Sequence, residues 1–144
     1  WLHDQGVDST REALIEGGRE LRRRGGPGIL AEMLLETLDG EDAVVDSIRT
    51  PAEVEALRSR GDFILIEVSA SEDSRWERMV GRGRTGDPGE KSVFLEQEAA
   101  ESHAEDEAGQ ALVATGNMAD VKIGNDGSIE DLEMKLESFW KGLS

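Results

Sequence analysis

The chain has 144 residues, the size of one ordinary domain, and Lys and Arg total 16 against 32 Asp and Glu, a net charge of −16. A surface this acidic repels duplex nucleic acid and anionic membranes, so we expect neither as a partner. No apolar run approaches the roughly 18 residues of a membrane span, no signal segment is recognisable, and the lack of cysteine excludes disulfides and thiolate chemistry. We therefore expect a cytoplasmic single domain over 1–144.

Two helices are predicted in the first forty residues. Capping-box spacing at Ser9 and Glu12, followed by apolar residues on one side, predicts a helix over 9–24. A Gly-Gly-Pro-Gly segment stops this helix. Apolar residues at helical spacing predict a second helix that begins near Ile29 and ends at Gly40.

The middle of the chain predicts two buried strands, each followed by a helix. Residues 43–46 form a short apolar run that is typical of a buried strand. Thr50 and Glu53, with a proline between them, then give a complete helix-start signal. Except for Glu67, the run over 63–68 is apolar on both faces, as in an interior strand of a parallel sheet, and a helix over 72–80 follows it.

The last part of the chain completes an alternating pattern. Residues 81–89 contain four Gly and one Pro, so this loop is either mobile or shaped around a ligand. A polar helical segment over 91–115, a third strand over 121–123 and a final amphipathic helix from 129 follow. This order of helices and buried strands predicts an α/β layered fold with a mainly parallel sheet.

Asp46 and Arg49 are the first candidates for chemistry. Asp46 ends a predicted strand, at the edge where open α/β sheets place their ligands, and Arg49 directly precedes a helix start. Such a pair can bind magnesium-bound phosphate, Asp46 through the metal or its waters and Arg49 through phosphate oxygens. Alternatively Asp46 accepts from loop amides and Arg49 pairs with Glu53, which the spacing alone favours.

A second candidate is a row of arginines on one predicted helix face. Arg75, Arg78 and Arg82 are spaced to share that face, and Arg84 follows in the glycine-rich loop. Like charges at this spacing repel one another unless an anion neutralises them. The row is therefore either a flexible phosphate-binding lid or a solvated charged face, and both interpretations stay open.

Other chemical signals are weak. The chain contains no G-x-x-x-x-G-K-[ST] phosphate loop, and residues 86–92 have the wrong spacing for one. His103 and Glu107 are four residues apart, as helical metal ligands can be, but they lie on an acidic helix face. We predict no metal site.

Five segments carry a family resemblance. They are STREALIEGGRELRRRGGPGILA (9–31), VVDSIRTPAEVEALR (44–58), FILIEVSASEDSRWERMVGRGRTGDP (63–88), FLEQEAAE (94–101) and ADVKIGNDGSIEDLEMKLE (119–137). In this order they resemble the P-loop nucleoside monophosphate kinases of the dephospho-coenzyme A kinase-like branch. The resemblance is greatest to predicted archaeal kinases and to the kinase-like domain fused to fungal deoxycytidylate deaminase.

The resemblance implies a three-layer P-loop NTPase-like fold with a parallel sheet, ATP and Mg²⁺ as cofactors, and nucleotides as partners. Residues 9–40 would form the acceptor-binding helices and 75–92 the lid. The resemblance also implies roles for single residues. Arg11 and Arg78 would bind the acceptor, Asp46 would lie near the reaction centre, and Arg49 would contact the transferring phosphate. Arg78, Arg82 and Arg84 would close over the nucleotide as the lid, and Asn125, Asp126 and Gly127 would pack beside adenine.

The chain also departs from the family pattern. Family members open with a strand, a phosphate loop and a helix, and we expect this chain to begin after all three. Because that segment holds the ATP phosphates, we expect little phosphoryl transfer from these residues alone. Ser47 stands where the family usually has glycine, and Gly124 precedes Asn125.

Two hypotheses follow from the resemblance and the departures. In the first, the chain is the greater part of an ATP-dependent nucleotide kinase. In the second, it is a non-catalytic nucleotide-sensing module or a homo-oligomer, which predicts self-association that covers an open sheet edge.

Overall fold

The structure is a computed structural model. It describes three stretches of the chain, with the side chains of residues 11 and 101 left aside: residues 3–38, 40–102 and 111–143. These residues form two compact units, one from 1–63 with 100–118 and the other from 64–99 with 119–144.

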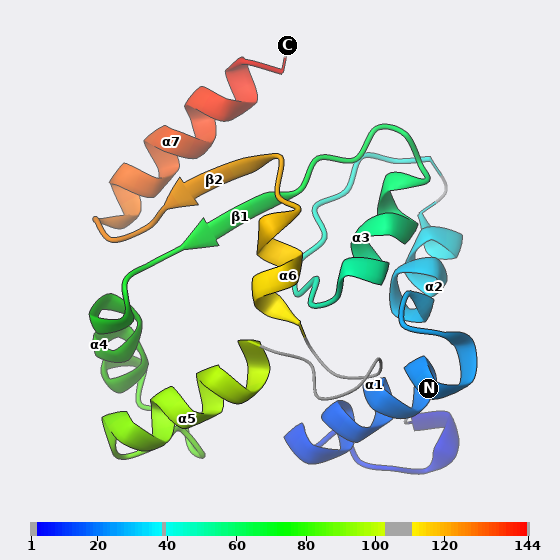
Figure 1. Ribbon diagram of the computed structural model, residues 1–144, viewed down its shortest axis with the longest axis horizontal. Helices are drawn as coiled ribbons and strands as arrows, with labels where there is room; N and C mark the ends of the chain where they lie inside the picture. The colour runs from blue at the N-terminus through cyan, green and yellow to red at the C-terminus, as the bar shows by residue number, and fades with distance from the viewer. Residues whose placement is uncertain (1–2, 39, 103–110, 144) are drawn as a thin grey trace. The chain divides into compact units, whose positions relative to one another are not determined.

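The first unit is helical in its described residues (Figure 1). Its elements in chain order are η1 (His3–Gln5), α1 (Arg11–Gly25), α2 (Ile29–Thr37), α3 (Pro51–Arg58) and α6 (Leu112–Asn117). The helices predicted at 9–24 and from Ile29 are confirmed. Helix α2 packs against both α1 and α3, and Ala31, Val54 and Leu57 form the buried apolar centre.

Helix α3 begins as its sequence predicts. The hydroxyl of Thr50 accepts from the Glu53 amide, while the Glu53 carboxylate accepts from the Thr50 amide, and Pro51 occupies the first helical position. This reciprocal capping box satisfies two backbone donors that a helix start leaves unpaired. The Thr50 hydroxyl also donates to the Pro27 carbonyl at 3.3 Å, which joins α3 to the turn before α2.

The strand predicted over 43–46 is wrong. These residues are irregular, and the side chain of Val44 is 97% exposed. A strand is stable only when its amides and carbonyls pair with a neighbouring strand. No strand lies in the described part of this unit to supply that partner, and Ser47 then turns the chain with a left-handed φ of 63°.

The second unit holds the sheet. Strands β1 (Ile66–Ser69) and β2 (Val121–Gly124) pair in parallel, with Ile66 opposite Val121 and Ser69 opposite Gly124. The third predicted strand is confirmed, and the one predicted over 63–68 begins three residues later, at Ile66. The described fold is therefore α/β, with helices flanking a small parallel two-stranded sheet.

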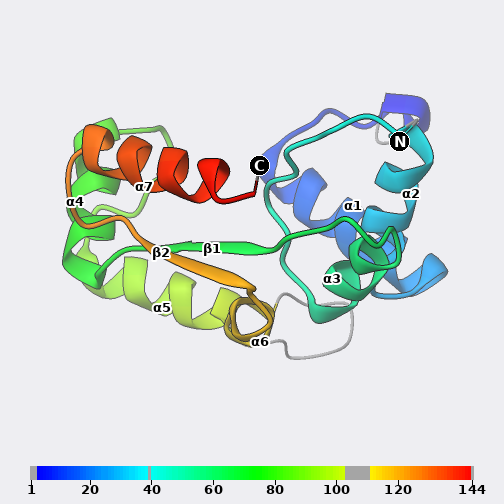
Figure 2. The same ribbon diagram turned by 90° about the horizontal axis from the view of Figure 1, so that it is seen from above.

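Three helices accompany this sheet. They are α4 (Glu72–Arg82), α5 (Lys91–Ser102), most of which belongs to this unit, and α7 (Ile129–Lys141). Figures 1 and 2 show α7 running back along β2, which it contacts. Helix α4 begins at Glu72, three residues after β1 ends at Ser69. The predicted helices over 72–80 and from 129 are confirmed, and the one predicted over 91–115 is two helices in the described residues, α5 and α6.

Candidate functional site

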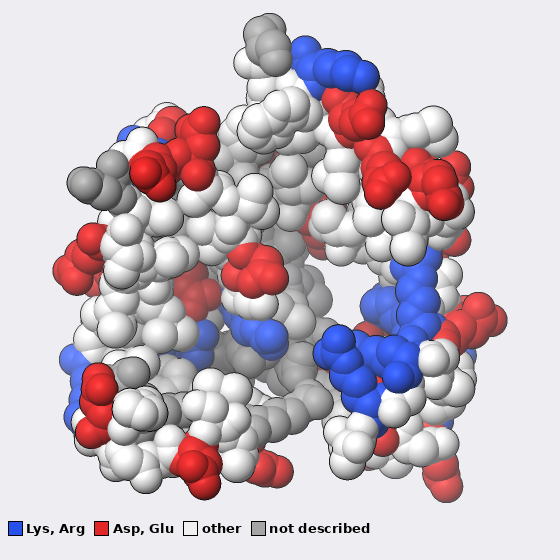
Figure 3. Space-filling view, turned by 180° about the vertical axis from the view of Figure 1, so that it is seen from behind, with Lys and Arg blue, Asp and Glu red and all other residues white. Residues whose placement is uncertain are grey.

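Helix α4 is the element that presents the arginine row. It begins because the Ser71 hydroxyl accepts from the Ser74 amide, and it ends at Gly83, which has the left-handed φ of 54° that glycine adopts easily. Arg75, Arg78 and Arg82 are all exposed on it. In Figure 3 blue side chains gather where α4 lies, at the lower right of a face that carries scattered red acidic groups.

Arg82 binds a carboxylate of its own loop. Its Nε and Nη2 each lie 3.0 Å from an oxygen of Asp87, one from Oδ2 and the other from Oδ1. The backbone amide of Arg84 donates to Asp87 Oδ2 at 3.2 Å. Hydrogen bonding by the Arg82 guanidinium holds the pKa of Asp87 below its ordinary value. Three N–H groups therefore converge on one anion.

The loop backbone supports this arrangement. The amide of Asp87 donates to the Arg84 carbonyl at 3.1 Å, which closes a turn over residues 84–87. The third residue of that turn, Gly86, has a φ of 92°, where a side chain would be strained. The predicted loop is thus shaped by its own carboxylate, and it brings Arg82 and Arg84 together.

Arg78 joins α4 to the turn over residues 125–127, which follows β2. Its Nη1 donates to the Asn125 carbonyl at 2.6 Å, and its Nη2 donates to the Gly127 carbonyl at 3.1 Å. Both acceptors are neutral carbonyl groups, and the positive charge of Arg78 also helps to lower the pKa of the nearby Asp126 carboxyl. Arg78 and the turn over 125–127, to which the resemblance gives separate nucleotide-binding roles, are therefore in contact.

Asp126 attaches the same turn to the start of α4. Its Oδ1 accepts from the Ser71 amide at 2.7 Å. That backbone bond, with help from the hydroxyls of Ser71 and Ser74, lowers the pKa of Asp126 to about 2. The ionised carboxylate of Asp126 therefore holds the turn over 125–127 against the N-terminus of α4.

Arg75 differs from the other arginines of α4. It makes a bidentate ion pair with Glu98 of α5, with both N–O distances 2.7 Å, and it also donates to the Ala70 carbonyl. The rings of Trp76 and Phe94 pack nearby with centroids 5.6 Å apart. Arg75 thus joins α4 to α5.

The remaining predicted residues belong to the first unit. Asp46 is exposed in the irregular segment before α3. Arg49 is half-buried, its amide donates to Glu53 Oε2 at 2.8 Å and its carbonyl accepts from the Ala111 amide. Arg11 begins α1, but its side chain lies outside the described part of the structure.

The structure changes the predicted pairing of Glu53. Glu53 Oε1 accepts from Arg22 Nη2 at 2.9 Å, and the two side chains are only 5% and 6% exposed. Sequence spacing suggested Arg49 as the partner, yet Arg49 contributes its backbone amide instead. Sequence spacing did not identify three residues as structural partners: Arg22 of Glu53, Asp87 of Arg82, and Ser71 of Asp126. Of these three, Asp87 alone had a local signal, because it lies in residues 75–92, the lid of the family resemblance.

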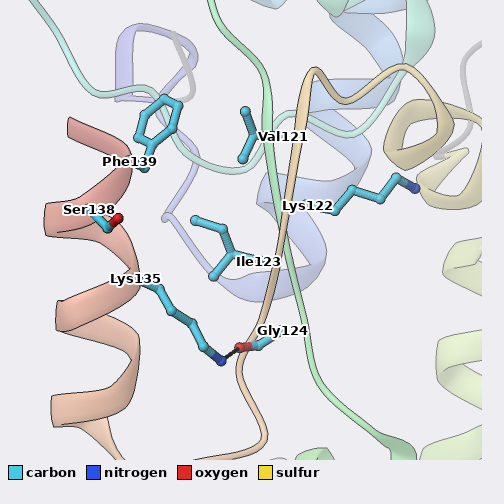
Figure 4. Close-up of a pocket in the computed structure, with 7 residues that line it drawn as sticks. All are labelled: Val121, Lys122, Ile123, Gly124, Lys135, Ser138 and Phe139. Atoms are coloured by element: carbon cyan, nitrogen blue, oxygen red, sulfur yellow. Dashed lines mark hydrogen bonds between the residues drawn. The ribbon is translucent and has the colours of Figure 1, made fainter. Parts of the chain in front are cut away.

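A shallow pocket lies between β2 and α7 (Figure 4). Its volume is about 350 Å³, and its lining includes Val121, Ile123 and Phe139. Lys135 reaches across it to donate to the Gly124 carbonyl. None of the predicted site residues lines this pocket.

Among the described residues, no group of three or more His, Asp or Glu is placed to hold a metal ion. The weak His103 and Glu107 candidate lies outside the described residues. In the same part of the chain, every helix is too short or too polar to cross a bilayer.

The fold and this site define an α/β protein whose parallel strand pair supports an arginine-rich helix and a glycine-rich loop. No family model matches the sequence, and no solved structure matches it. The chain is 37% identical to a UPF0200 protein of Pyrobaculum aerophilum over 115 residues, which covers 78% of this chain and 63% of that protein. It is 36% identical to one of Methanothrix thermoacetophila, covering 83% of the chain and 65% of the relative.

A third relative shows which family the chain belongs to. The chain is 30% identical to the UPF0200 protein of Hyperthermus butylicus, over 92% of the chain and 70% of that protein. The chain belongs to the UPF0200 family. It spans about two-thirds of the length of these relatives, whose names state no activity.

Proposed function

We propose that this chain contains the lid and the acceptor-binding helices of an ATP-dependent kinase. The kinase phosphorylates a (deoxy)nucleoside monophosphate or dephospho-coenzyme A. The observation that carries the proposal is Arg82 holding a carboxylate with two parallel N–H···O bonds on a glycine-rich loop. The same fork geometry binds a phosphate group. In this proposal the fold is P-loop NTPase-like, and β1 and β2 are part of a larger parallel sheet.

The charge of the lid supports phosphate as the ligand. The guanidinium of Arg78 donates to two neutral carbonyl groups, and the exposed Arg84 of the loop donates to Asp87 through its backbone amide. Phosphoryl transfer spreads negative charge over the oxygens of the transferring group. Arginines delivered by a loop stabilise that charge and exclude water when the loop closes.

The two implied cofactors fit the described residues unequally. The phosphates of ATP fit the donors of Arg82 and Arg84, because those donors already bind an oxyanion. Mg²⁺ prefers several oxygen ligands in octahedral geometry, and Asp46 stands exposed without a carboxylate cluster in the described residues. The described residues therefore do not fit Mg²⁺, and no step is assigned to it.

The proposed kinase needs a phosphate loop in addition to the lid arginines. The 144 residues contain no G-x-x-x-x-G-K-[ST] motif, so the groups that hold the β- and γ-phosphates must come from other residues. We therefore expect these residues alone to bind nucleotide phosphates weakly and to form no measurable ADP. Measuring the intact mass of the native polypeptide and mapping its N-terminus would show whether it contains such a phosphate loop.

The test is phosphoryl transfer by the polypeptide as it occurs in its source. ADP formation from ATP is measured with a panel of ribonucleoside and deoxyribonucleoside monophosphates and with dephospho-coenzyme A. We expect one acceptor class to support turnover and Arg82→Ala to lower kcat by about 100-fold without changing Tm. Arg23→Ala, an exposed arginine of α1, is the control. No turnover with any acceptor, or an unchanged rate in Arg82→Ala, would contradict the proposal.

One observation favours the second hypothesis, a non-catalytic oligomer. Strands β1 and β2 pair only with each other in the described residues, and Val68 of β1 is half exposed. An unpaired strand edge favours pairing with another strand. Light scattering on the native polypeptide tests this hypothesis: a concentration-dependent dimer supports it, and a monomer at all concentrations excludes it.

A further inference from the structure

We propose that the Arg82 guanidinium and the Arg84 amide form an oxyanion site that Asp87 occupies in the unliganded protein, and that a phosphate group binds there by displacing the Asp87 carboxylate. We call these two donor groups the lid anion site. The inference rests on the proposed function, because it specifies how that function's ligand enters. It adds a residue, Asp87, that competes with the ligand.

The first support is the match between the donors and a phosphate. Arg82 Nε, Arg82 Nη2 and the Arg84 amide lie 3.0, 3.0 and 3.2 Å from the two oxygens of Asp87. Parallel guanidinium bonds with a converging backbone amide bind carboxylate and phosphate alike. The site is therefore already assembled around an anion.

The second support is access. The Arg82 side chain is 48% exposed, whereas that of Asp87 is 10% exposed. An incoming anion can therefore reach the guanidinium from solvent while Asp87 still occupies the other side. A phosphate with up to two negative charges and three acceptor oxygens competes well with one carboxylate.

The third support is the backbone of the loop. Gly83 and Gly86 both have positive φ values, 54° and 92°, and Gly81 and Gly89 have open space around them. Glycine crosses between backbone conformations at low cost. The Asp87 carboxylate can therefore leave the site by a change in the loop alone, with α4 unaltered.

The Arg75–Glu98 pair provides an internal contrast. It has the same bidentate geometry on the same helix. Its carboxylate, however, comes from helix α5, and the Trp76–Phe94 contact fixes the two helices beside it. We therefore expect no exchange at Glu98, which makes Glu98→Gln the matched control.

The experiment is calorimetric titration of the full chain with inorganic pyrophosphate at constant ionic strength. Asp87→Asn removes the competing charge, so we expect its affinity for pyrophosphate to rise by about fivefold. Glu98→Gln should bind as the unaltered chain does, and Asp87→Asn with Arg82→Ala should lose the gain. Equal affinities of Asp87→Asn and the unaltered chain would overturn the proposal.

A measurement on the unaltered chain makes the test independent of how the variants fold. Titration with pyrophosphate, followed by NMR, should shift the Asp87 side-chain carboxyl carbon and the Arg82 Nε–H resonance while those of Glu98 and Arg75 stay in place. If Arg82 shifts and Asp87 does not, displacement is wrong and phosphate binding by the lid stands. If neither shifts and Arg82→Ala binds normally, phosphate binding by the lid fails as well.

Discussion

Arg22 of α1 and Glu53 of α3 form an ion pair with Nη2 and Oε1 2.9 Å apart, and both side chains are almost completely buried. The other oxygen of Glu53 accepts from the amides of Arg49 and Thr50. One buried carboxylate thus joins α1 to the start of α3 and fixes the backbone at Arg49. Arg22 Nε is buried with no hydrogen-bond partner in the described structure, so the pair depends on this single contact.

Removing Arg22 should therefore strongly destabilise the first unit. Arg22→Ala leaves the Glu53 charge buried and unpaired, and we expect the free energy of unfolding to fall by about 3 kcal/mol. Urea denaturation followed by circular dichroism measures this change. The control is Arg24→Ala, since Arg24 pairs with Glu20 on the exposed surface of α1. Similar midpoints for the two variants would refute the structural role of the buried pair.

The sequence predicted one half of this arrangement. Thr50, Pro51 and Glu53 form a local signal, so the capping box of α3 is readable from spacing. The Arg22 partner is 31 residues away, and spacing carries no information on such a contact. The prediction of a strand at 43–46 was wrong for a similar reason. An apolar run becomes a strand only beside another strand, and spacing does not show whether one lies there.

Ser47 gives a prediction on backbone strain. Its φ of 63° lies in the left-handed region, which costs a residue with a side chain more than it costs glycine. Ser47→Gly should raise the free energy of unfolding by about 0.5 kcal/mol, after the entropy that glycine adds to the unfolded chain. Ser59, with an ordinary φ of −59°, is the control, and Ser59→Gly should destabilise. Destabilisation by both substitutions would contradict the strain at Ser47.

Asp126 gives a prediction on pH. Its pKa in the folded chain is about 2, below the ordinary 3.8, because its ionised form accepts from Ser71. Its stabilising effect is complete above about pH 4 and is lost as the pH falls toward 2. The difference in urea midpoint between the unaltered chain and Asp126→Asn should therefore shrink across that range. A difference that stays constant from pH 5 to pH 2 would be evidence against this bond.

Arg78 should hold the turn that begins after β2. Because its guanidinium donates to the carbonyls of Asn125 and Gly127, Arg78→Ala should increase amide hydrogen exchange over residues 125–128. Arg84→Ala is the comparison, since Arg84 donates to Asp87 through its backbone amide, which the substitution keeps. Exchange is measured by mass spectrometry. Equal exchange in the two variants would mean that the Arg78 bonds do not stabilise the turn.

The sequence also predicted part of the candidate site. Helical spacing placed Arg75, Arg78 and Arg82 on one helix, and the structure keeps them there. Spacing did not separate their roles, because those depend on the acceptors: Glu98 for Arg75, two carbonyls for Arg78 and Asp87 for Arg82. Asp126, which the resemblance places beside adenine, accepts from the Ser71 amide at the start of α4, and spacing could not predict this contact between residues 55 positions apart.

The central claim is that the lid arginines bind nucleotide phosphate, and nucleotide affinity tests it most directly. Trp76 lies in α4 among these arginines, so its fluorescence can report ATP binding to the native polypeptide. We predict saturable binding that is weakened by about tenfold in the Arg82→Ala, Arg84→Ala double variant, with an unchanged melting curve. The same affinity in the double variant as in the unaltered protein would contradict the claim.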